Sequence, residues 1–264
     1  MTTSKKFVFV FIILIIFACF LIFLSPFSNK PSQNPNNTDG PLKAAIVDQL
    51  SISQPNGTFV ETSIAVLNTS GFEAYYFGGE NVTVDFYRDL PSYDFDLIIF
   101  RVHSTGECSA ENAPPWVVFF SNEPYNEAKH FSEQMAGQVV RVRFVGEESD
   151  SYFGITPLFV KDCLNGRFSD AVIIAMGCDG LKYTSMADAF VQKGAEVYIG
   201  WDEDVFAHHT DLATTHLLQC LIIQRLTIAQ AIAETRNKVG PDPAFNSKLT
   251  FTPITATLYV IPES

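Results

Sequence analysis

The sequence predicts an α/β domain in which a mostly parallel sheet lies between two helical layers, a three-layer αβα sandwich, preceded by one transmembrane helix. Three observations predict this class. Short apolar runs of strand length alternate with segments that have helical spacing. The 264 residues are 47% hydrophobic and 13% aromatic, which is ample material for a core. One long apolar run lies close to the N-terminus.

That N-terminal run covers residues 7–24 and reads FVFVFIILIIFACFLIFL, without a charged or polar side chain. At about 1.5 Å per residue it would span roughly 27 Å, close to the hydrocarbon core of a bilayer. Lys5 and Lys6 precede it and favour a cytoplasmic N-terminus over residues 1–6. We therefore expect a single-pass anchor in the cell membrane, with the bilayer as a partner and the domain outside.

The alternative is a cleaved signal peptide, which would make the domain a secreted one. The apolar run is longer than the usual core of about 7–15 residues, and no A-x-A-like site follows it. Residues 25–41, rich in Pro, Asn and Ser, are typical of a flexible stalk. Four N-x-S/T sequons agree with an outside location and predict glycosylation at Asn36, Asn56, Asn68 and Asn81.

One domain, residues 42–264, accounts for the rest of the chain. Apolar runs predict strands over residues 43–50, 72–77, 96–103, 171–176, 196–200 and 257–261. Helical spacing, with glycine or proline at several ends, predicts helices over 58–69, 157–166, 185–193, 212–226 and 228–239. Residues 84–90 read as a short helix or loop. Two further strand-like runs, 116–120 and 138–145, predict an inserted hairpin or an extension of the sheet.

Reactive residues follow two of the predicted strands. His103 ends the run DLIIFRVH, and Cys178 follows AVIIAM after one glycine. Ligands of open α/β sheets bind beyond the carboxyl ends of the strands, so the two side chains can meet there. The imidazole can then exchange a proton while the thiolate attacks a carbonyl. The backbone N–H of Cys178, with that of Ser104, Thr105 or Gly106, can form an oxyanion hole.

These two strands and the stretch CDGLKYTSMADAFVQKGAEVYIGW, which begins at Cys178, resemble the caspase, legumain, gingipain and clostripain group of cysteine peptidases. The layout is similar to gingipain-like and CHAT-type domains over roughly residues 43–226. The resemblance implies a caspase-like fold and an endopeptidase that acts on peptides or proteins without a cofactor. Cys178 would be the nucleophile, His103 the general acid/base, and the backbone amides of Ser104 and Cys178 the oxyanion hole.

The chain departs from the pattern of that group beside both His103 and Cys178 and in the separation between them, 103 to 178, which is longer than in most members and includes the insertion over 116–145. Its members usually have glycine directly after the histidine, where this chain has Ser104. They commonly have an acidic residue and alanine before the cysteine, where this chain has Met176 and Gly177. The glycine at 177 is expected to be sterically harmless, whereas Ser104 is expected to reshape the oxyanion loop.

The acidic residues after Trp201 give a prediction about the substrate. Asp202 and Asp204 lie at the end of the next strand, where a carboxylate can pair with an Arg or Lys side chain of a substrate. We therefore name both as substrate-binding residues and expect cleavage after a basic residue. The competing interpretation is a solvated acidic loop.

Several other functions are disfavoured. The net charge of −12 repels phosphate backbones and argues against nucleic-acid binding. No nucleotide-binding, zinc-protease or serine-hydrolase motif is present in the sequence. His208, His209 and His216 are badly spaced for one metal ion, so we expect surface histidines and no metal site.

Two alternatives to a peptidase remain open. One is a catalytically inactive caspase-fold domain displayed on the cell surface for ligand binding or sensing. The other is a glutamine amidotransferase-like or flavodoxin-like domain, which we expect a different strand order to reveal. A disulfide at Cys178 would exclude the peptidase, whereas a Cys108–Cys163 or Cys163–Cys220 bridge would leave that thiol free.

Overall fold

The computed structural model describes residues 40–106, 115–144 and 150–263. The compact unit runs from Gly40 to the C-terminus. The expected anchor (7–24), the residues before it, most of the stalk, Asn36 and Cys108 lie outside the described residues. Within the ranges that are described, no helix is long and apolar enough to cross a bilayer.

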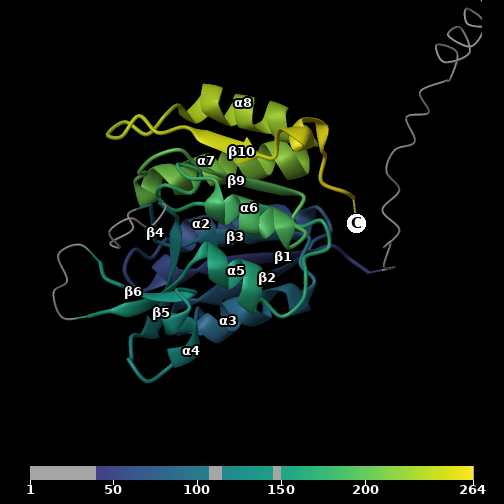
Figure 1. The fold of residues 1–264 in the computed structure, drawn as a ribbon. Coiled ribbons are helices and arrows are strands. Elements are labelled where there is room, and N and C mark those ends of the chain that lie inside the picture. The colour runs from purple at the N-terminus through teal and green to yellow at the C-terminus, as the bar shows by residue number, and fades with distance from the viewer. Residues whose placement is uncertain (1–39, 107–114, 145–149, 264) are drawn as a thin grey trace, which may run out of the picture. The chain divides into compact units, whose positions relative to one another are not determined.

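A six-stranded sheet forms the centre of the domain, with the order β10-β9-β8-β3-β1-β2 (Figure 1). Its parallel members are β1 (Lys43–Asp48), β2 (Glu73–Gly78), β3 (Leu97–Arg101), β8 (Val172–Ala175) and β9 (Val197–Trp201). β10 (Leu249–Thr252) closes one edge antiparallel to β9. Strands β1, β3, β8 and β9 are almost wholly buried, as strands covered on both faces should be. The predicted mostly parallel α/β sheet is confirmed.

Helices cover both faces of this sheet. Those on one face are α2 (Gly57–Thr69), α7 (Ala207–Leu218) and α8 (Ile228–Val239). Those on the other face are α3 (Val84–Asp89), α5 (Pro157–Cys163) and α6 (Ser185–Gln192). Local sequence sets their ends: Thr227 and Gln230 form a capping box before α8, and Gly71 after α2 has a φ of 86°. A π-turn, Gln219–Ile223, continues α7.

The inserted segment forms a second, antiparallel sheet with the order β4-β5-β7-β6. Its strands are β4 (Ser104–Thr105), β5 (Val118–Pro124), β6 (Val139–Val142) and β7 (Tyr152–Ile155), with the short helix α4 (Phe131–Met135) between β5 and β6. The expectation of a simple hairpin or sheet extension is therefore wrong. The two predicted runs do not pair with each other, because β7, which the sequence analysis missed, lies between them.

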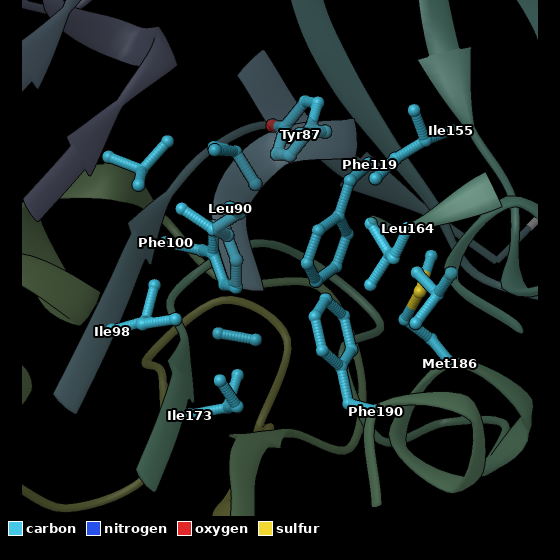
Figure 2. Close-up of a cluster of buried hydrophobic side chains, with 14 of the residues drawn as sticks. Tyr87, Leu90, Ile98, Phe100, Phe119, Ile155, Leu164, Ile173, Met186 and Phe190 are labelled. Atoms are coloured by element: carbon cyan, nitrogen blue, oxygen red, sulfur yellow. The ribbon is translucent and has the colours of Figure 1, made fainter. Parts of the chain in front are cut away.

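The second sheet contributes to the core on the α5–α6 face of the large sheet. Figure 2 shows Phe100 of β3, Phe119 of β5 and Phe190 of α6 packed against one another. The ring centroids lie 5.4 Å apart for Phe100–Phe119, 5.6 Å for Phe100–Phe190 and 6.1 Å for Phe119–Phe190. All three rings are buried, so the insertion is an integral layer of the domain.

Two expectations about topology need correction. The strand expected over residues 257–261 is instead part of a 3₁₀ turn, Ile254–Leu258, and an extended tail, in which Leu258 is highly exposed. The edge strand is β10, whose threonines gave no apolar run. The parallel strands follow the order β2-β1-β3-β8-β9, which is the flavodoxin-like order. Strand order therefore does not separate the flavodoxin-like alternative from the caspase-like one.

Candidate active site at the strand ends

The candidate residues His103 and Cys178 follow β3 and β8, which are adjacent parallel strands. Two hydrogen bonds join the loops that carry them. Ser104 Oγ donates to the carbonyl oxygen of Cys178 at 2.5 Å, and the N–H of Gly106 donates to Asp179 Oδ2 at 2.9 Å. Asp179 has a φ of 57°, a left-handed conformation that these bonds stabilise. The structure therefore brings the two loops together at the carboxyl edge of the sheet.

The glycine before Cys178 is required by the chain that faces it on both sides of His103. A Cβ at position 177 would lie 2.2 Å from Ser104 Oγ and 2.4 Å from the carbonyl oxygen of Val102. Both distances are far shorter than a van der Waals contact. An alanine at 177 would collide both with the Ser104 hydroxyl and with the main chain at Val102, so the backbone here requires glycine and Ser104 adds to that requirement.

The Cys178 side chain is a free, half-buried thiol. Its sulfur lies 3.5 Å from both the N–H and the carbonyl oxygen of Val205 and packs against the core layer under α7. Burial, together with the nearby carboxylates of Asp204 and Asp179, raises the pKa of Cys178 to about 11, although the Val205 N–H opposes this shift. The thiol is therefore protonated at neutral pH.

The His103 side chain lies beside the second sheet. Its backbone N–H donates to Gln49 Oε1 at 2.9 Å, and its ring centroid lies 4.8 Å from that of Phe144 and 5.9 Å from that of Phe120. Burial and the positive charge of Arg101 lower the pKa of His103 to about 4. The imidazole is neutral at pH 7 and can accept a proton. In the described part of the chain, no hydrogen bond joins this ring to the Cys178 sulfur.

The backbone N–H groups of Ser104, Thr105 and Gly106, considered as oxyanion donors, differ in their hydrogen bonds. The N–H of Gly106 is already bonded to Asp179. Ser104 is paired with Phe119, and the neighbouring Phe120 N–H donates to the carbonyl oxygen of His103 at 3.0 Å. Ser104 is therefore a non-hydrogen-bonded pair member, whose N–H points away from β5. Of Ser104 and Gly106, Ser104 is the one whose N–H is not bonded to Asp179 and is the candidate to join Cys178 in an oxyanion hole.

The two acidic residues predicted to bind substrate have different surroundings. Asp202 Oδ1 accepts the backbone N–H of Lys248 at 2.6 Å and so fixes the pairing of β9 with β10. Asp204 is exposed and lies close enough to Cys178 to raise the pKa of the thiol. Between them, Glu203 pairs with Lys182 Nζ at 2.8 Å. Of the two predicted carboxylates, Asp204 is the one that remains available beside the sulfur.

A buried charge network that was not predicted from the sequence lies at the end of β3. Arg101 donates to Asp211 through Nε (2.7 Å) and Nη2 (2.9 Å), and to Asp48 through Nη1 (2.8 Å). Arg101 and Asp48 are 1% exposed and Asp211 is 4% exposed, so all three charges are withdrawn from solvent. A lone arginine in an otherwise apolar strand, directly before Val102 and His103, is the signal that could have revealed it.

The predicted sequons also differ in their contacts. Asn56 Nδ2 donates to Asp211 Oδ2 at 2.8 Å, and its Oδ1 caps α2, so this amide is engaged in the fold. Asn81 Nδ2 donates to the carbonyl oxygen of Gly78 at 3.1 Å from an exposed position. Asn68 is exposed in the last turn of α2. Asn68 and Asn81 therefore offer the more accessible side chains of the three described sequons.

The remaining histidines and cysteines lie apart. His209 is buried beside Trp201, against the expectation of a surface position, because its ring packs on the indole at 5.5 Å. His216 Nδ1 lies 3.6 Å from the buried sulfur of Cys220, one turn along the helix. Cys163 packs on the opposite face of the sheet from Cys220, and both thiols are free, so the Cys163–Cys220 bridge is excluded.

Neither a protein-family model nor a curated protein matches this chain. What the site can do therefore follows from its own residues. A protonated thiol and a neutral imidazole follow adjacent strands, the N–H of Ser104 faces away from β5, and the carboxylate of Asp204 is exposed. This set of groups is suited to nucleophilic attack on a carbonyl carbon.

Proposed function

We propose that the chain is a membrane-anchored cysteine endopeptidase of the caspase-like group, which cleaves peptides outside the cytoplasm. Cys178 acts as the nucleophile and His103 as the general acid/base. The observation that carries the proposal is the joining of the two strand-end loops, in which Ser104 Oγ bonds to the carbonyl oxygen of Cys178. That bond holds a thiol and an imidazole at one edge of a rigid sheet.

A general-base mechanism is the one open to this pair, because both groups are neutral at rest. The pKa values of about 4 for His103 and about 11 for Cys178 oppose the proton transfer, so bound substrate has to bring the two values closer together. The thiol is neutral and the imidazole is neutral, so the ring takes the thiol proton as the sulfur attacks the peptide carbonyl. The N–H groups of Ser104 and Cys178 stabilise the oxyanion. Collapse of the intermediate breaks the C–N bond, and the imidazolium returns its proton to the leaving amine. Water then hydrolyses the thioester, with His103 again as the base.

One side-chain movement is part of this mechanism. The Cys178 sulfur now rests against Val205, and a change of χ1 to another staggered rotamer would turn it away from that backbone. In this proposal, contact with a bound peptide favours that rotamer. The resting thiol would be protected from oxidation, and the substrate would complete the dyad.

The acidic surroundings of Cys178 support a substrate with a basic side chain. Asp204 is exposed next to the sulfur. Burial and the nearby carboxylate of Asp179 raise the pKa of Asp204, whereas the charge of Lys182 and the hydrogen bond from Cys178 lower it. A guanidinium or ammonium group placed there would offset the repulsion between the two carboxylates and form charge-assisted hydrogen bonds. We therefore expect Arg or Lys before the scissile bond.

Hydrolysis of fluorogenic peptides by the purified full-length chain tests the proposal. Peptides with Arg or Lys before the cleaved bond should be hydrolysed, and Cys178→Ala or His103→Ala should abolish the activity. Cys163→Ala, which removes a free thiol on the other face of the sheet, is the matched control and should leave the rate unchanged. Equal activity in wild type and Cys178→Ala would contradict the mechanism.

A second candidate is an inactive binding or sensing domain of the same fold. It is favoured by the contact of the sulfur with Val205 at 3.5 Å, which occupies the thiol away from the His103 ring. Peptide that binds to the wild-type chain without being hydrolysed would favour this candidate. A flavodoxin-like ligand site is less well supported, because the buried residues Asp48 and Arg101 fill the point between β1 and β3 where such ligands bind.

A further inference from the structure

Two exposed phenylalanines lie next to the Cys178 loop and contact each other. Phe206, directly before α7, and Phe245, in the loop before β10, are each 43% exposed. Their ring centroids are 5.1 Å apart, and the His208 ring stacks on Phe206 at 5.6 Å. Grouped exposed aromatic rings are unusual on a surface with no binding role, because apolar area in water is unfavourable.

A buried carboxylate fixes the backbone at both phenylalanines. Asp242 is only 1% exposed, and its Oδ2 accepts the N–H of Phe206 at 3.0 Å. Its Oδ1 accepts the N–H groups of Ala244 and Phe245 at 2.9 and 3.1 Å. The two segments are thus tied to one buried group, which preorganises the backbone from which the two rings project.

The position of this surface connects it to the candidate nucleophile. Val205, the residue before Phe206, contacts the Cys178 sulfur through its backbone at 3.5 Å. Asp204, which precedes Val205, is exposed and interacts electrostatically with the same sulfur. A peptide that reaches Cys178 therefore meets a carboxylate and an aromatic surface within three consecutive residues of this loop.

We propose that Phe206 and Phe245 form the subsite for an apolar, preferably aromatic, side chain of the peptide substrate, while Asp204 takes a neighbouring basic side chain. The assignment rests on the proposed peptidase function and narrows its substrates to peptides that combine these two features. The acidic residues disfavour acidic peptides at the same place. The aromatic pair supplies affinity by removing apolar substrate surface from water.

Peptides that differ in one side chain test the subsite. A series with Phe, Leu, Ala or Gly adjacent to a constant Arg is hydrolysed by the full-length chain and by Phe206→Ala and Phe245→Ala. Loss of one apolar contact is expected to lower kcat/KM for the Phe peptide about 10- to 100-fold, mainly through KM. The Gly peptide should be hydrolysed at the same rate by all three proteins.

Phe131→Ala is the matched control, because Phe131 is 61% exposed on α4 and makes no contact with the aromatic pair. It should leave the whole series unchanged. Phe245→Ala keeps the backbone hydrogen bonds to Asp242 and so guards against misfolding, which thermal unfolding of each variant also checks. An equal loss for the Phe and Gly peptides, or no loss for either, would overturn the subsite.

Binding separates failure of the subsite from failure of the peptidase. Fluorescence anisotropy of the labelled Phe-Arg peptide is measured with Cys178→Ser, alone and combined with Phe206→Ala. Binding that depends on Phe206 without any hydrolysis by wild type would retain the subsite and contradict the peptidase. Hydrolysis that depends on Cys178 but not on either phenylalanine would retain the peptidase and contradict the subsite. Absence of both binding and hydrolysis would contradict both.

Discussion

Ser104 and Gly177 show how one residue restricts another across two loops. The Ser104 hydroxyl holds the carbonyl group of Cys178, and that hydroxyl and the carbonyl oxygen of Val102 occupy the space beside the Cα of residue 177. Glycine is harmless there, as expected, and the geometry in addition makes it necessary. The orientation of the peptide bond after Cys178 thus depends on a pair of residues that are far apart in the sequence.

Gly177→Ala is therefore expected to destabilise the domain by about 2–3 kcal/mol, because overpacking at a rigid contact forces the backbone to move. The shift in the urea unfolding midpoint measures this loss. Gly180→Ala is the matched control, since its Cβ would lie no closer than 3.5 Å to Gly200 or Trp201, an ordinary contact. Equal midpoints for the two variants would contradict the steric account.

The pKa of Cys178 predicts an unusual pH dependence for its alkylation. Burial and the neighbouring carboxylates raise this pKa to about 11, so the thiolate fraction at pH 8 is small. The rate with iodoacetamide should rise about tenfold per pH unit up to pH ~11, beyond the point at which an ordinary thiol levels off. Mass spectrometry separates this adduct from that of Cys163.

Removal of one carboxylate tests the cause of the shift. Asp204→Asn removes a negative charge near the sulfur, lowers the pKa of Cys178 and should speed alkylation at pH 8. Asp202→Asn is the control, because that carboxylate accepts the N–H of Lys248 and does not act on the thiol. An alkylation rate that levels off by pH 9, or one that is the same in wild type and Asp204→Asn, would contradict a pKa of Cys178 raised by burial and by Asp204.

At the scale of elements, the Arg101 network connects three parts of the domain. Arg101 ends β3, Asp48 ends β1 and Asp211 lies in α7, so three elements meet at one guanidinium. Asn56, at the start of α2, adds a fourth through its bond to Asp211. The network fixes the strand ends on which His103 is carried, and its positive charge helps to keep that imidazole neutral.

Arg101→Met is expected to cost about 3–5 kcal/mol, because it leaves the carboxylates of Asp48 and Asp211 buried without their partner. Arg141→Met, at an exposed arginine of β6, should change stability by less than about 0.5 kcal/mol. Denaturant unfolding followed by circular dichroism compares the two. Equal free energies of unfolding for Arg101→Met and Arg141→Met would contradict the role of Arg101 as the partner that stabilises the buried carboxylates of Asp48 and Asp211.

The elements that the sequence predicted well are those with a strong local signal. β1, β3, β8 and β9 are apolar on both faces, and helices such as α8 have caps that mark their ends. β7 was missed because it has four residues, one of them Gly154, whose missing side chain makes room for Val118 and Val142. β10 was misplaced because an edge strand with one buried face shows little apolar sequence.

At the scale of the whole molecule, sequence alone could place His103 and Cys178 at one edge but not describe their side chains. Parallel pairing of β3 with β8 follows from the alternation of strands and helices. The rest depends on long-range contacts: the sulfur against Val205, the ring against Phe144, and the buried partner of Arg101 in α7. No local pattern encodes such contacts.

The anchor predicted over residues 7–24 gives a test of location. The full-length chain should sediment with membranes and resist extraction by alkaline carbonate, because about 18 apolar residues span a bilayer. A chain of residues 42–264 should remain in the supernatant. A full-length chain that is released by carbonate, or that has lost these residues in the mature protein, would contradict the anchor and favour secretion.

Covalent labelling of the thiol tests the central claim most directly. A peptidyl chloromethyl ketone that ends in Phe-Arg is incubated with the full-length chain, and the adduct is located by mass spectrometry. The account predicts labelling of Cys178 and not of Cys163, blocked by excess substrate peptide and lost in His103→Ala, where the proton acceptor is missing. Labelling of both thiols at similar rates, or labelling of Cys178 that does not depend on His103, would contradict a catalytic pair at these strand ends.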